Sequence, residues 1–325
     1  MIYHFENADP SGKEFLAVLE RNAIDFEQGV FDRTVVRILG VIKPEVREEL
    51  AKIYGRRSRA GTRLSPAKAL YSEFTHRTEP IIIAGPCSVE SEEQIAETAI
   101  FLESVGIRFM RGGAYKPRTS PDSFQGLGRS GLKLLSHHAR KHGLKVVSEV
   151  MDRSQIGDLL EHADIIQVGS RNMFNYTLLT ALGSVDKPIL LKRGMAATID
   201  EWISASDYCR RGGNDAIILC ERGIRTFEPK TRNTLDISAI CIAKKLSGYP
   251  VIADPSHATG DADLVLPVAL AALSAGADGV MIEIHPKPEQ ALSDREQALS
   301  FSQFEHVLRK IADHRLGRTQ SPEMG

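Results

Sequence analysis

The sequence predicts an α/β protein: a (β/α)8 TIM barrel preceded by a small N-terminal ferredoxin-like α+β module. From about residue 80 onward, short apolar runs rich in β-branched residues alternate with amphipathic helical stretches, as in a parallel sheet covered on both faces. Eight such units fit a closed barrel better than an open doubly wound sheet, which usually has fewer strands. The glycine fingerprint of dinucleotide-binding sheets follows none of the eight runs.

Each expected strand of the barrel is a short apolar run that ends in polar or turn-forming residues. The eight runs are "IIIAG" from 81, "IRFMRGG" from 107, "KVVSEV" from 145, "DIIQVGS" from 164, "PILLKRG" from 188, "AIILCERG" from 216, "PVIADPSH" from 250 and "GVMIEIHP" from 279. The helical stretch "SEEQIAETAIFLESVG" begins at Ser91, a suitable N-cap, and "DADLVLPVALAALSAGA" carries Gly276 near its end. These signals place helices between successive strands.

The first part of the chain has a different pattern. The segments "MIYHF", "SGKEFLAVLERN", "IDFEQGVF", "RTVVRILGVI" and "KPEVREELAKIYG" follow one another there. Their order is strand, helix, strand, strand, helix, which predicts a ferredoxin-like module over residues 1–56 whose last strand is not evident. The cationic stretch "GRRSRAGTRLSP" then indicates a linker over residues 57–78, and the barrel is expected to occupy residues 79–325.

Composition limits the classes of function. The chain has 325 residues, 42% of them hydrophobic, and a formal net charge of −1, so a large core is expected and a general affinity for nucleic acid is not. No long uncharged apolar segment and no signal-like N-terminus occur, which predicts a cytoplasmic protein without a membrane span. The four cysteines lack the spacing of a zinc finger or disulfide scaffold, so reduced thiols are expected.

Polar residues occur where all eight strands are expected to end. They are Cys87, Arg111 with Lys116, Glu149, Arg171, Lys192 with Arg193, Glu221 with Arg222, Asp254 with His257, and Glu283 with His285. Active sites of TIM barrels lie at the carboxyl ends of the strands, so these residues are candidates for a common site. The alternative is that they are ordinary loop charges, because loops are polar in any protein.

One group of candidates has the chemistry of a metal site. Cys87, His257 and Glu283 offer one sulfur, one nitrogen and one oxygen donor, a mixed set suited to a divalent transition metal with an open coordination position. Asp294, in "ALSDREQ" after the last strand, is a possible fourth ligand. The alternatives are that Cys87 is a small buried apolar residue and that His257 caps a helix or belongs to the core.

A second group of candidates is cationic. Its members are Arg111, Lys116, Arg118, Arg171, Lys192 and Arg222. Guanidinium groups bind phosphate and carboxylate oxygens in pairs, and lysine adds a compact charge. Their convergence in a nearly neutral protein predicts a substrate with more than one anionic group, unless they pair with acidic residues around the mouth of the barrel.

Several motifs together resemble one enzyme family. The motifs are "IIIAGPCSVES", "RGGAYKPRTSPDSFQGLG", "IIQVGSRN", "PILLKRG", "ILCERGIRTFE", "NTLDISA", "ADPSHATG" and "EIHPKPEQALSD". From about residue 72 to 312 the chain resembles the type I beta 3-deoxy-D-arabino-heptulosonate 7-phosphate (DAHP) synthases. "KPRTSP" and "ALSD" are specific to that branch, whereas "DPSH" and "GPC" are shared with the 3-deoxy-octulosonate 8-phosphate synthases. The resemblance implies the first reaction of the shikimate pathway, in which phosphoenolpyruvate, erythrose 4-phosphate and water give DAHP and phosphate.

The resemblance also implies roles for individual residues. Cys87, His257, Glu283 and Asp294 would bind a divalent metal ion, namely Mn, Zn, Co or Fe(II). Arg111, Lys116 and Lys192 would face the phosphoenolpyruvate carboxylate, and Arg171, Lys192 and Arg222 would hold its phosphate. Ser170 is a further expected substrate-binding residue. Arg118 and Thr119 would hold the phosphate of erythrose 4-phosphate, and Glu149 would lie near the attacking water. Lys116, Glu149 and His257 are the expected catalytic residues.

Other features leave alternatives open. Asp261 and Asp263 stand in "ATGDADL", where basic residues are expected in this branch. The N-terminal module resembles a feedback sensor for tyrosine or phenylalanine, or else serves to hold together a homo-oligomer, expected to be a tetramer or dimer. Two other functions are a synthase for another aldose such as arabinose 5-phosphate, and a catalytically silent barrel that acts as a regulatory or scaffolding partner of another enzyme.

Overall fold

Eight parallel strands form a closed barrel in this computed structural model. The strands are β4 (Ile81–Gly85), β5 (Phe109–Arg111), β6 (Lys145–Val150), β7 (Ile165–Val168), β8 (Ile189–Lys192), β9 (Ile217–Glu221), β10 (Val251–Ala253) and β11 (Gly279–Glu283). Strand β11 returns to pair with β4 from Gly279↔Ile81 to Glu283↔Gly85, which closes the barrel. The eight strands expected from the sequence are confirmed, and with them the (β/α)8 architecture.

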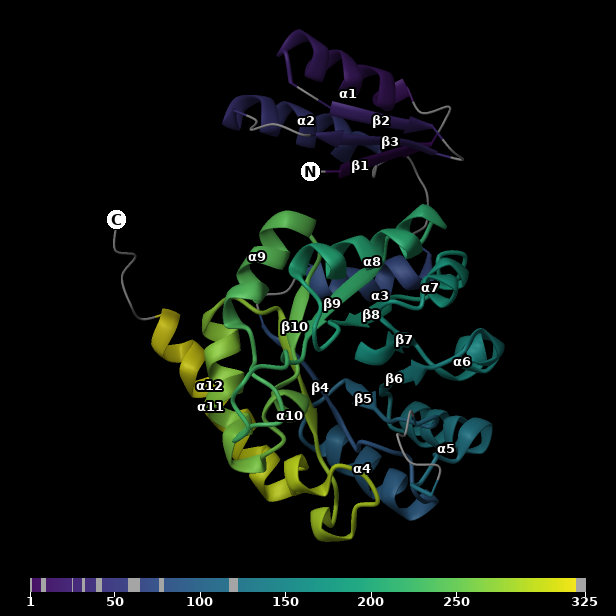
Figure 1. The fold of residues 1–325 in the computed structure, drawn as a ribbon, viewed down its shortest axis with the longest axis vertical. Helices are drawn as coiled ribbons and strands as arrows, with labels where there is room; N and C mark the ends of the chain where they lie inside the picture. The colour runs from purple at the N-terminus through teal and green to yellow at the C-terminus, as the bar shows by residue number, and fades with distance from the viewer. Residues whose placement is uncertain are drawn as a thin grey trace. The chain divides into compact units, whose positions relative to one another are not determined.

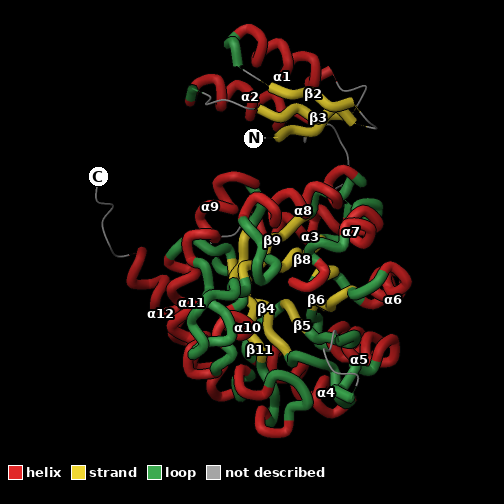
Figure 2. The backbone as a smooth tube through the Cα atoms, viewed as in Figure 1, coloured by secondary structure: helices red, strands yellow, loops and turns green. Residues whose placement is uncertain are grey.

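Helices surround the barrel and connect its strands (Figures 1 and 2). They are α4 (Glu92–Ser104), α5 (Gly128–Lys141), α6 (Ile156–His162), α7 (Tyr176–Leu182), α8 (Ile199–Arg211), α9 (Ile237–Ser247), α10 (Pro255–Thr259), α11 (Ala262–Ser274) and α12 (Phe301–Thr319). Ser91 caps α4 by accepting a hydrogen bond from the Gln94 backbone N–H, as the sequence predicts. Gly276 follows α11 with φ of 92°, a conformation that favours glycine.

The structure describes residues 2–6, 10–24, 26–30, 33–38, 43–57, 65–75, 79–116 and 122–319. The chain divides into two compact units, the first made mainly of residues 1–64 and the second of residues 65–245 and 249–325. The barrel and its helices belong to the second unit.

Two apolar layers stabilise the barrel. The outer layer lies between strands and helices, and includes Met110, Leu191 and Trp202. The inner layer fills the barrel with side chains that point inward, among them Ile83 and Phe109. Because strand side chains alternate between the two faces, each strand contributes to both layers.

A helix that the sequence analysis did not anticipate lies in the interval expected to be a linker, residues 57–78. Helix α3 (Pro66–Thr75) packs Leu70 and Phe74 into the inner apolar layer, and the rings of Phe74 and Phe109 have centroids 5.3 Å apart. Glu73 at the helix pairs with Arg108, just before β5, at 2.7 Å. The helix therefore closes the amino-terminal end of the barrel.

The N-terminal unit has an antiparallel sheet of order β1-β3-β2 and two helices. Its elements are β1 (Ile2–Glu6), α1 (Pro10–Arg21), β2 (Phe26–Val30), β3 (Arg33–Ile38) and α2 (Pro44–Arg57). Phe15 and Leu19 of α1 pack with Leu50 and Ile53 of α2. The order of elements is the expected one, and assignment to the ferredoxin-like class with limits 1–56 stays a prediction.

Candidate active site

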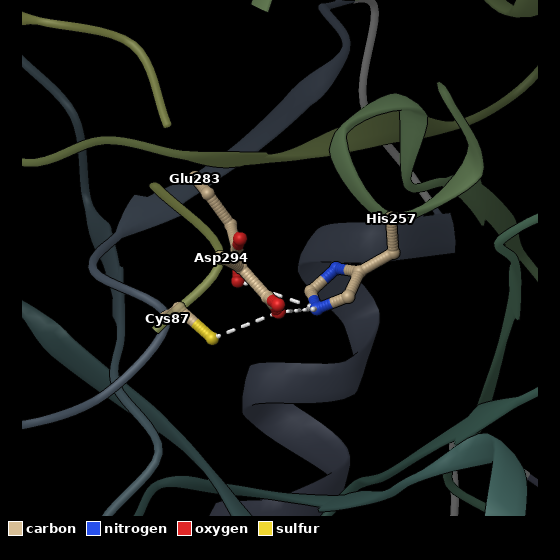
Figure 3. Close-up of side chains that lie close together, drawn as sticks. All are labelled: Cys87, His257, Glu283 and Asp294. Atoms are coloured by element: carbon tan, nitrogen blue, oxygen red, sulfur yellow. Dashed lines mark hydrogen bonds and ion pairs between the residues drawn. The ribbon is translucent and has the colours of Figure 1, made fainter. Parts of the chain in front are cut away.

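Four potential metal ligands meet at the carboxyl end of the barrel (Figure 3). Cys87 follows β4, His257 lies in α10, Glu283 ends β11, and Asp294 lies in the loop before α12. One donor atom from each lies within 4.8 Å of the other three. The Cys87 Sγ is 3.3 Å from Asp294 Oδ2, and His257 Nε2 is 3.3 Å from Glu283 Oε1. The structure thus brings together all the residues expected to bind metal.

Asp254 fixes the orientation of His257. Its carboxylate caps α10 by accepting from the His257 backbone N–H at 3.0 Å, and its Oδ2 lies 2.8 Å from His257 Nδ1. Lys192 Nζ donates to the same Oδ2 at 2.6 Å. With Nδ1–H donating to Asp254, the His257 Nε2 lone pair is free to face the cluster, a common arrangement for a metal-binding histidine.

The carboxylate of Glu283 is held on several sides. Arg111 Nη1 pairs with its Oε1, Gln297 Nε2 donates to its Oε2 at 2.5 Å, and its backbone N–H donates to Ser256 Oγ at 3.0 Å. Burial alone would raise the pKa of Glu283, but nearby His257 and Arg111 outweigh burial and lower it. The anionic form is favoured in the position where a cation would bind.

Asp294 occupies an unusual backbone conformation, with φ of 52°, in the left-handed region that a non-glycine residue rarely adopts. Arg232 Nη1 lies 3.3 Å from its Oδ1. Burial would raise the pKa of Asp294, yet Arg232 and His257 hold it well below its usual range. The loop therefore presents a carboxylate, not a carboxylic acid, to the cluster.

The four residues fit a divalent metal ion. Without a cation, burial and the nearby Glu283 raise the pKa of Cys87 to about 12. A divalent cation would favour the thiolate and both carboxylates. One sulfur, one nitrogen and two carboxylate oxygens form a donor set that suits divalent transition metals, and Asp254 supplies the outer support that such sites have.

A cavity of about 240 Å³ opens beside the cluster. Its lining includes Lys116, Ser123, Glu149, Gly169, Ser170, Arg171, Lys192, Met195, Arg222, Arg232, His257 and Asp294. Arg222 is only 4% exposed, and among the described residues neither Arg171 nor Arg222 forms an ion pair. A buried, unpaired guanidinium facing a cavity is costly unless an anion binds there. Burial accordingly lowers the pKa of Arg222.

Several expected substrate contacts line this cavity, and others do not. Lys116 Nζ donates to the Cys87 backbone oxygen at 2.9 Å and lies 3.0 Å from its Sγ. The carboxylate of Glu149 accepts from Gln167 Nε2 at 2.7 Å. Arg111 is buried against Glu283 and is not part of the cavity lining. Arg118 and Thr119 lie outside the described residues.

Some residues of the site were not found from the sequence. Arg232 and Met195 line the cavity, and Gln297 contacts Glu283. Arg232 and Gln297 lie away from the strand ends, and Met195, shortly after β8, is uncharged and so was not among the polar candidates. Conversely, two candidates from strand ends pair with each other, since Arg193 Nη1 lies 2.9 Å from Glu221 Oε2. Arg193 and Glu221 therefore neutralise each other, which was the alternative to a role at a common site.

Comparison with known proteins agrees with the fold. The model of the DAHP synthetase I family matches residues 74–316. A Thermotoga maritima protein named phospho-2-dehydro-3-deoxyheptonate aldolase is 53% identical over 235 residues, covering 71% of this chain and 70% of its own length. A Desulfotalea psychrophila 2-dehydro-3-deoxyphosphooctonate aldolase is 30% identical over 249 residues, covering 71% of this chain and 88% of the relative.

Two solved structures from Thermotoga maritima are also similar. A truncated 3-deoxy-D-arabino-heptulosonate 7-phosphate synthase superposes with a TM-score of 0.68 at 47% identity, covering 72% of this chain and 86% of that one. A phospho-2-dehydro-3-deoxyheptonate aldolase (DAHP synthase) has a TM-score of 0.70 at 40% identity and covers 96% of both chains. From its barrel, the family match and these relatives, the chain belongs to the DAHP synthetase I family.

Proposed function

We infer that the chain condenses phosphoenolpyruvate with erythrose 4-phosphate and water to give DAHP and inorganic phosphate. The main observation in support of this function is the cavity, where buried Arg222 and Lys192 lie beside the four candidate metal ligands. Family membership supports the same reaction. The enzyme is accordingly a metal-dependent transferase at the start of aromatic biosynthesis.

The cations divide between the two anionic groups of phosphoenolpyruvate. Lys116 and Lys192 face its carboxylate, while Arg171 and Arg222, together with Lys192 and Ser170, hold its phosphate. Fixed positive charge in a cavity shielded from water offsets the repulsion that a second phosphate ester would otherwise experience. Arg111 contributes by fixing Glu283, which is the contact that its side chain makes.

The chemistry joins two carbon atoms and expels phosphate. Held by Cys87, His257, Glu283 and Asp294, a divalent metal supplies Lewis acidity toward the aldehyde oxygen. Carbon 3 of phosphoenolpyruvate forms a bond to the aldehyde carbon, whose oxygen takes up a proton and becomes a hydroxyl. Water adds to carbon 2, and the bond from carbon 2 to the phosphate oxygen breaks, so that phosphate leaves and a ketone remains. Of the two protons that the water gives up, one replaces the proton taken by the aldehyde oxygen and the other leaves with phosphate. Glu149, oriented by Gln167, lies near the water and accepts its proton.

The choice of aldehyde is tested directly. Purified enzyme is assayed with phosphoenolpyruvate and either erythrose 4-phosphate or arabinose 5-phosphate, and kcat/KM is compared by phosphate release and product mass. We expect the four-carbon aldose to be preferred, because identity is 53% to a heptonate enzyme and 30% to an octonate enzyme. Preference for arabinose 5-phosphate would overturn this assignment, and absence of turnover with either would favour a silent barrel.

Metal dependence has its own test. Activity should disappear after strong chelation and return with Mn, Zn, Co or Fe(II), because the donor set binds such ions reversibly. Cys87→Ala should fold normally and fail to regain activity at the metal concentration that restores the parent enzyme. Full activity of protein shown to be metal-free would refute the metal assignment.

Three broader features complete the proposal. None of the described helices is long and apolar enough to cross a membrane; a cytoplasmic location and a homo-oligomer, tetrameric or dimeric, stay predictions from the sequence. Tyrosine or phenylalanine sensing by the N-terminal unit is supported by the order of its elements, and binding of either amino acid to the intact enzyme would test it.

A further inference from the structure

Gln297 contacts the carboxylate of Glu283, one of the four candidate metal ligands. Its side chain is buried, with 2% of its surface exposed, and its Nε2 donates to Glu283 Oε2 at 2.5 Å. Its Oε1 accepts from Arg232 Nη1 at 3.0 Å. Both ends of one amide are therefore engaged, one by an anion and the other by a cation.

These partners determine which way the amide points. Arginine carries only N–H donors, so the Gln297 oxygen must face Arg232, and the NH₂ group must then face Glu283. A reversed amide would set its NH₂ against a guanidinium and its oxygen against a carboxylate, two repulsive contacts in a buried place. Arg232 consequently fixes the donor that holds Glu283.

Arg232 also reaches the second carboxylate of the cluster. The same Nη1 that bonds Gln297 lies 3.3 Å from Asp294 Oδ1. The backbone around Arg232 is anchored as well, since its N–H donates to the Thr259 oxygen at 2.9 Å, in the helix that carries His257. Arg232 thus contacts the loop of Asp294 and Gln297 through its guanidinium, and the helix of His257 through its backbone.

We propose that Arg232 and Gln297 form a positioning pair that orients both carboxylate ligands, Glu283 through Gln297 and Asp294 directly. The proposal rests on the assignment of the cluster as a metal site. Gln297 holds Oε2 of Glu283 while Arg111 pairs with its Oε1, and Oε1 is the atom that lies 3.3 Å from His257 Nε2. The pair therefore fixes the rotation of the Glu283 carboxylate, so that Oε1 faces the other three candidate ligands.

The test measures metal binding, not turnover. Metal-free full-length enzyme and the Gln297→Met variant, which keeps the side-chain length but loses both hydrogen bonds, are titrated with Mn²⁺ by calorimetry. Loss of an outer partner of a metal ligand typically weakens affinity about 10- to 100-fold, and that decrease is expected. The Co²⁺-loaded variant should also show altered visible absorption bands, because a carboxylate no longer held at Oε2 can turn and would change the arrangement of donors around the ion.

A double variant tests whether Arg232 acts on Glu283 through Gln297. If Arg232 acts on Glu283 through Gln297, the combined loss in Arg232→Met/Gln297→Met will be smaller than the product of the two single losses. Independent, multiplicative losses would overturn the coupling. Should Gln297→Met fail to fold by circular dichroism, Gln297→Asn, whose shorter amide cannot reach both partners, takes its place in the same titration.

Controls separate this inference from the metal assignment. Asn214→Ala removes another buried amide, which bonds the Lys187 oxygen at 2.9 Å near the start of β8, and should lower stability without changing Mn²⁺ affinity. If Cys87→Ala and the parent enzyme bind Mn²⁺ equally weakly, the metal assignment fails. If Cys87→Ala loses affinity but Gln297→Met retains parent affinity and spectrum, only the positioning role fails.

Discussion

Gly169 leaves room for the carboxylate of Glu149. A Cβ at this position would lie 2.1 Å from Glu149 Oε1, although the backbone φ of −70° suits any residue. We predict that Gly169→Ala folds normally but displaces Glu149 and breaks its bond to Gln167. Misplacement of this size should lower kcat by about 10- to 100-fold, with a smaller change in KM for phosphoenolpyruvate.

A matched alanine substitution provides the control. Gly157 lies in α6 with no atom within 4 Å of a built Cβ, so Gly157→Ala should keep kcat and gain up to about 1 kcal/mol of stability from helix propensity. Steady-state kinetics measures kcat of both variants, and thermal unfolding measures their stability. Equal kcat in Gly169→Ala and parent enzyme would exclude a catalytic role for the Glu149 position.

At the level of residues, the sequence predicts part of the site, and the rest depends on loop conformation. Cys87, His257 and Glu283 lie at strand ends, and a parallel barrel must bring those ends together. Arg232 and Gln297 lie far along loops, where no periodic sequence pattern predicts which way a side chain points. Arg193 lies at a strand end, yet it pairs with a neighbouring carboxylate, because composition cannot distinguish charges that face a ligand from charges that neutralise each other.

At the level of elements, the barrel strands were predictable because each is apolar on both faces and bounded by turn residues. Helix α3 was not, since its sequence "PAKALYSEFT" follows a cationic stretch and is too short for a clear periodicity. Tertiary contact with the barrel core stabilises it, which local sequence does not reveal.

The N-terminus of α8 allows a prediction about capping. Thr198 accepts from the Glu201 backbone N–H at 3.2 Å, and Glu201 Oε2 accepts from the Thr198 backbone N–H at 2.8 Å, a capping box. Thr198→Ala should therefore destabilise the protein by about 1 kcal/mol. Urea unfolding at neutral pH measures the loss, and Thr177→Ala in the first turn of α7 serves as a comparison without a capping box.

The same cap predicts a dependence on pH. The hydrogen bonds from Thr198 lower the pKa of Glu201 from its usual 4.5. A lowered carboxyl pKa adds stability above the unfolded value, and that stability is lost as pH falls through the folded value. Parent enzyme should thus exceed Glu201→Gln in stability at pH 7, and the difference should shrink below about pH 4.5. A difference that is constant across the acid range would contradict this.

At the level of the whole molecule, the position of α3 determines where the chain can be shortened. The second compact unit begins at Ser65, and Leu70 and Phe74 belong to the barrel core. Deletion of residues 1–64 should leave a folded enzyme with near-parental kcat. Deletion through residue 75 should expose Ile81 and Phe109 and cause aggregation or a markedly lower melting temperature, because apolar surface then faces water.

The deletion of residues 1–64 also tests the proposed sensor. If the N-terminal unit senses tyrosine or phenylalanine, the enzyme lacking residues 1–64 will be active and indifferent to both, whereas the full chain will be inhibited. If the unit only supports an oligomer, size-exclusion chromatography will show a smaller assembly and inhibition will be absent from both proteins. Similar inhibition of full and shortened chains would place the effector site in the barrel.

The packing of Leu70 and Phe74 has a kinetic consequence. Because α3 and the inner apolar layer fill the amino-terminal end, both reactants must enter, and both products must leave, at the opposite end. Arg222 and Lys192 are each only 4% exposed, so phosphoenolpyruvate bound to them, as we propose, would occupy the inner position and be covered by the aldose. With a single entrance and phosphoenolpyruvate innermost, we expect a compulsory order in which phosphoenolpyruvate binds first, because an aldose bound first would obstruct its own partner.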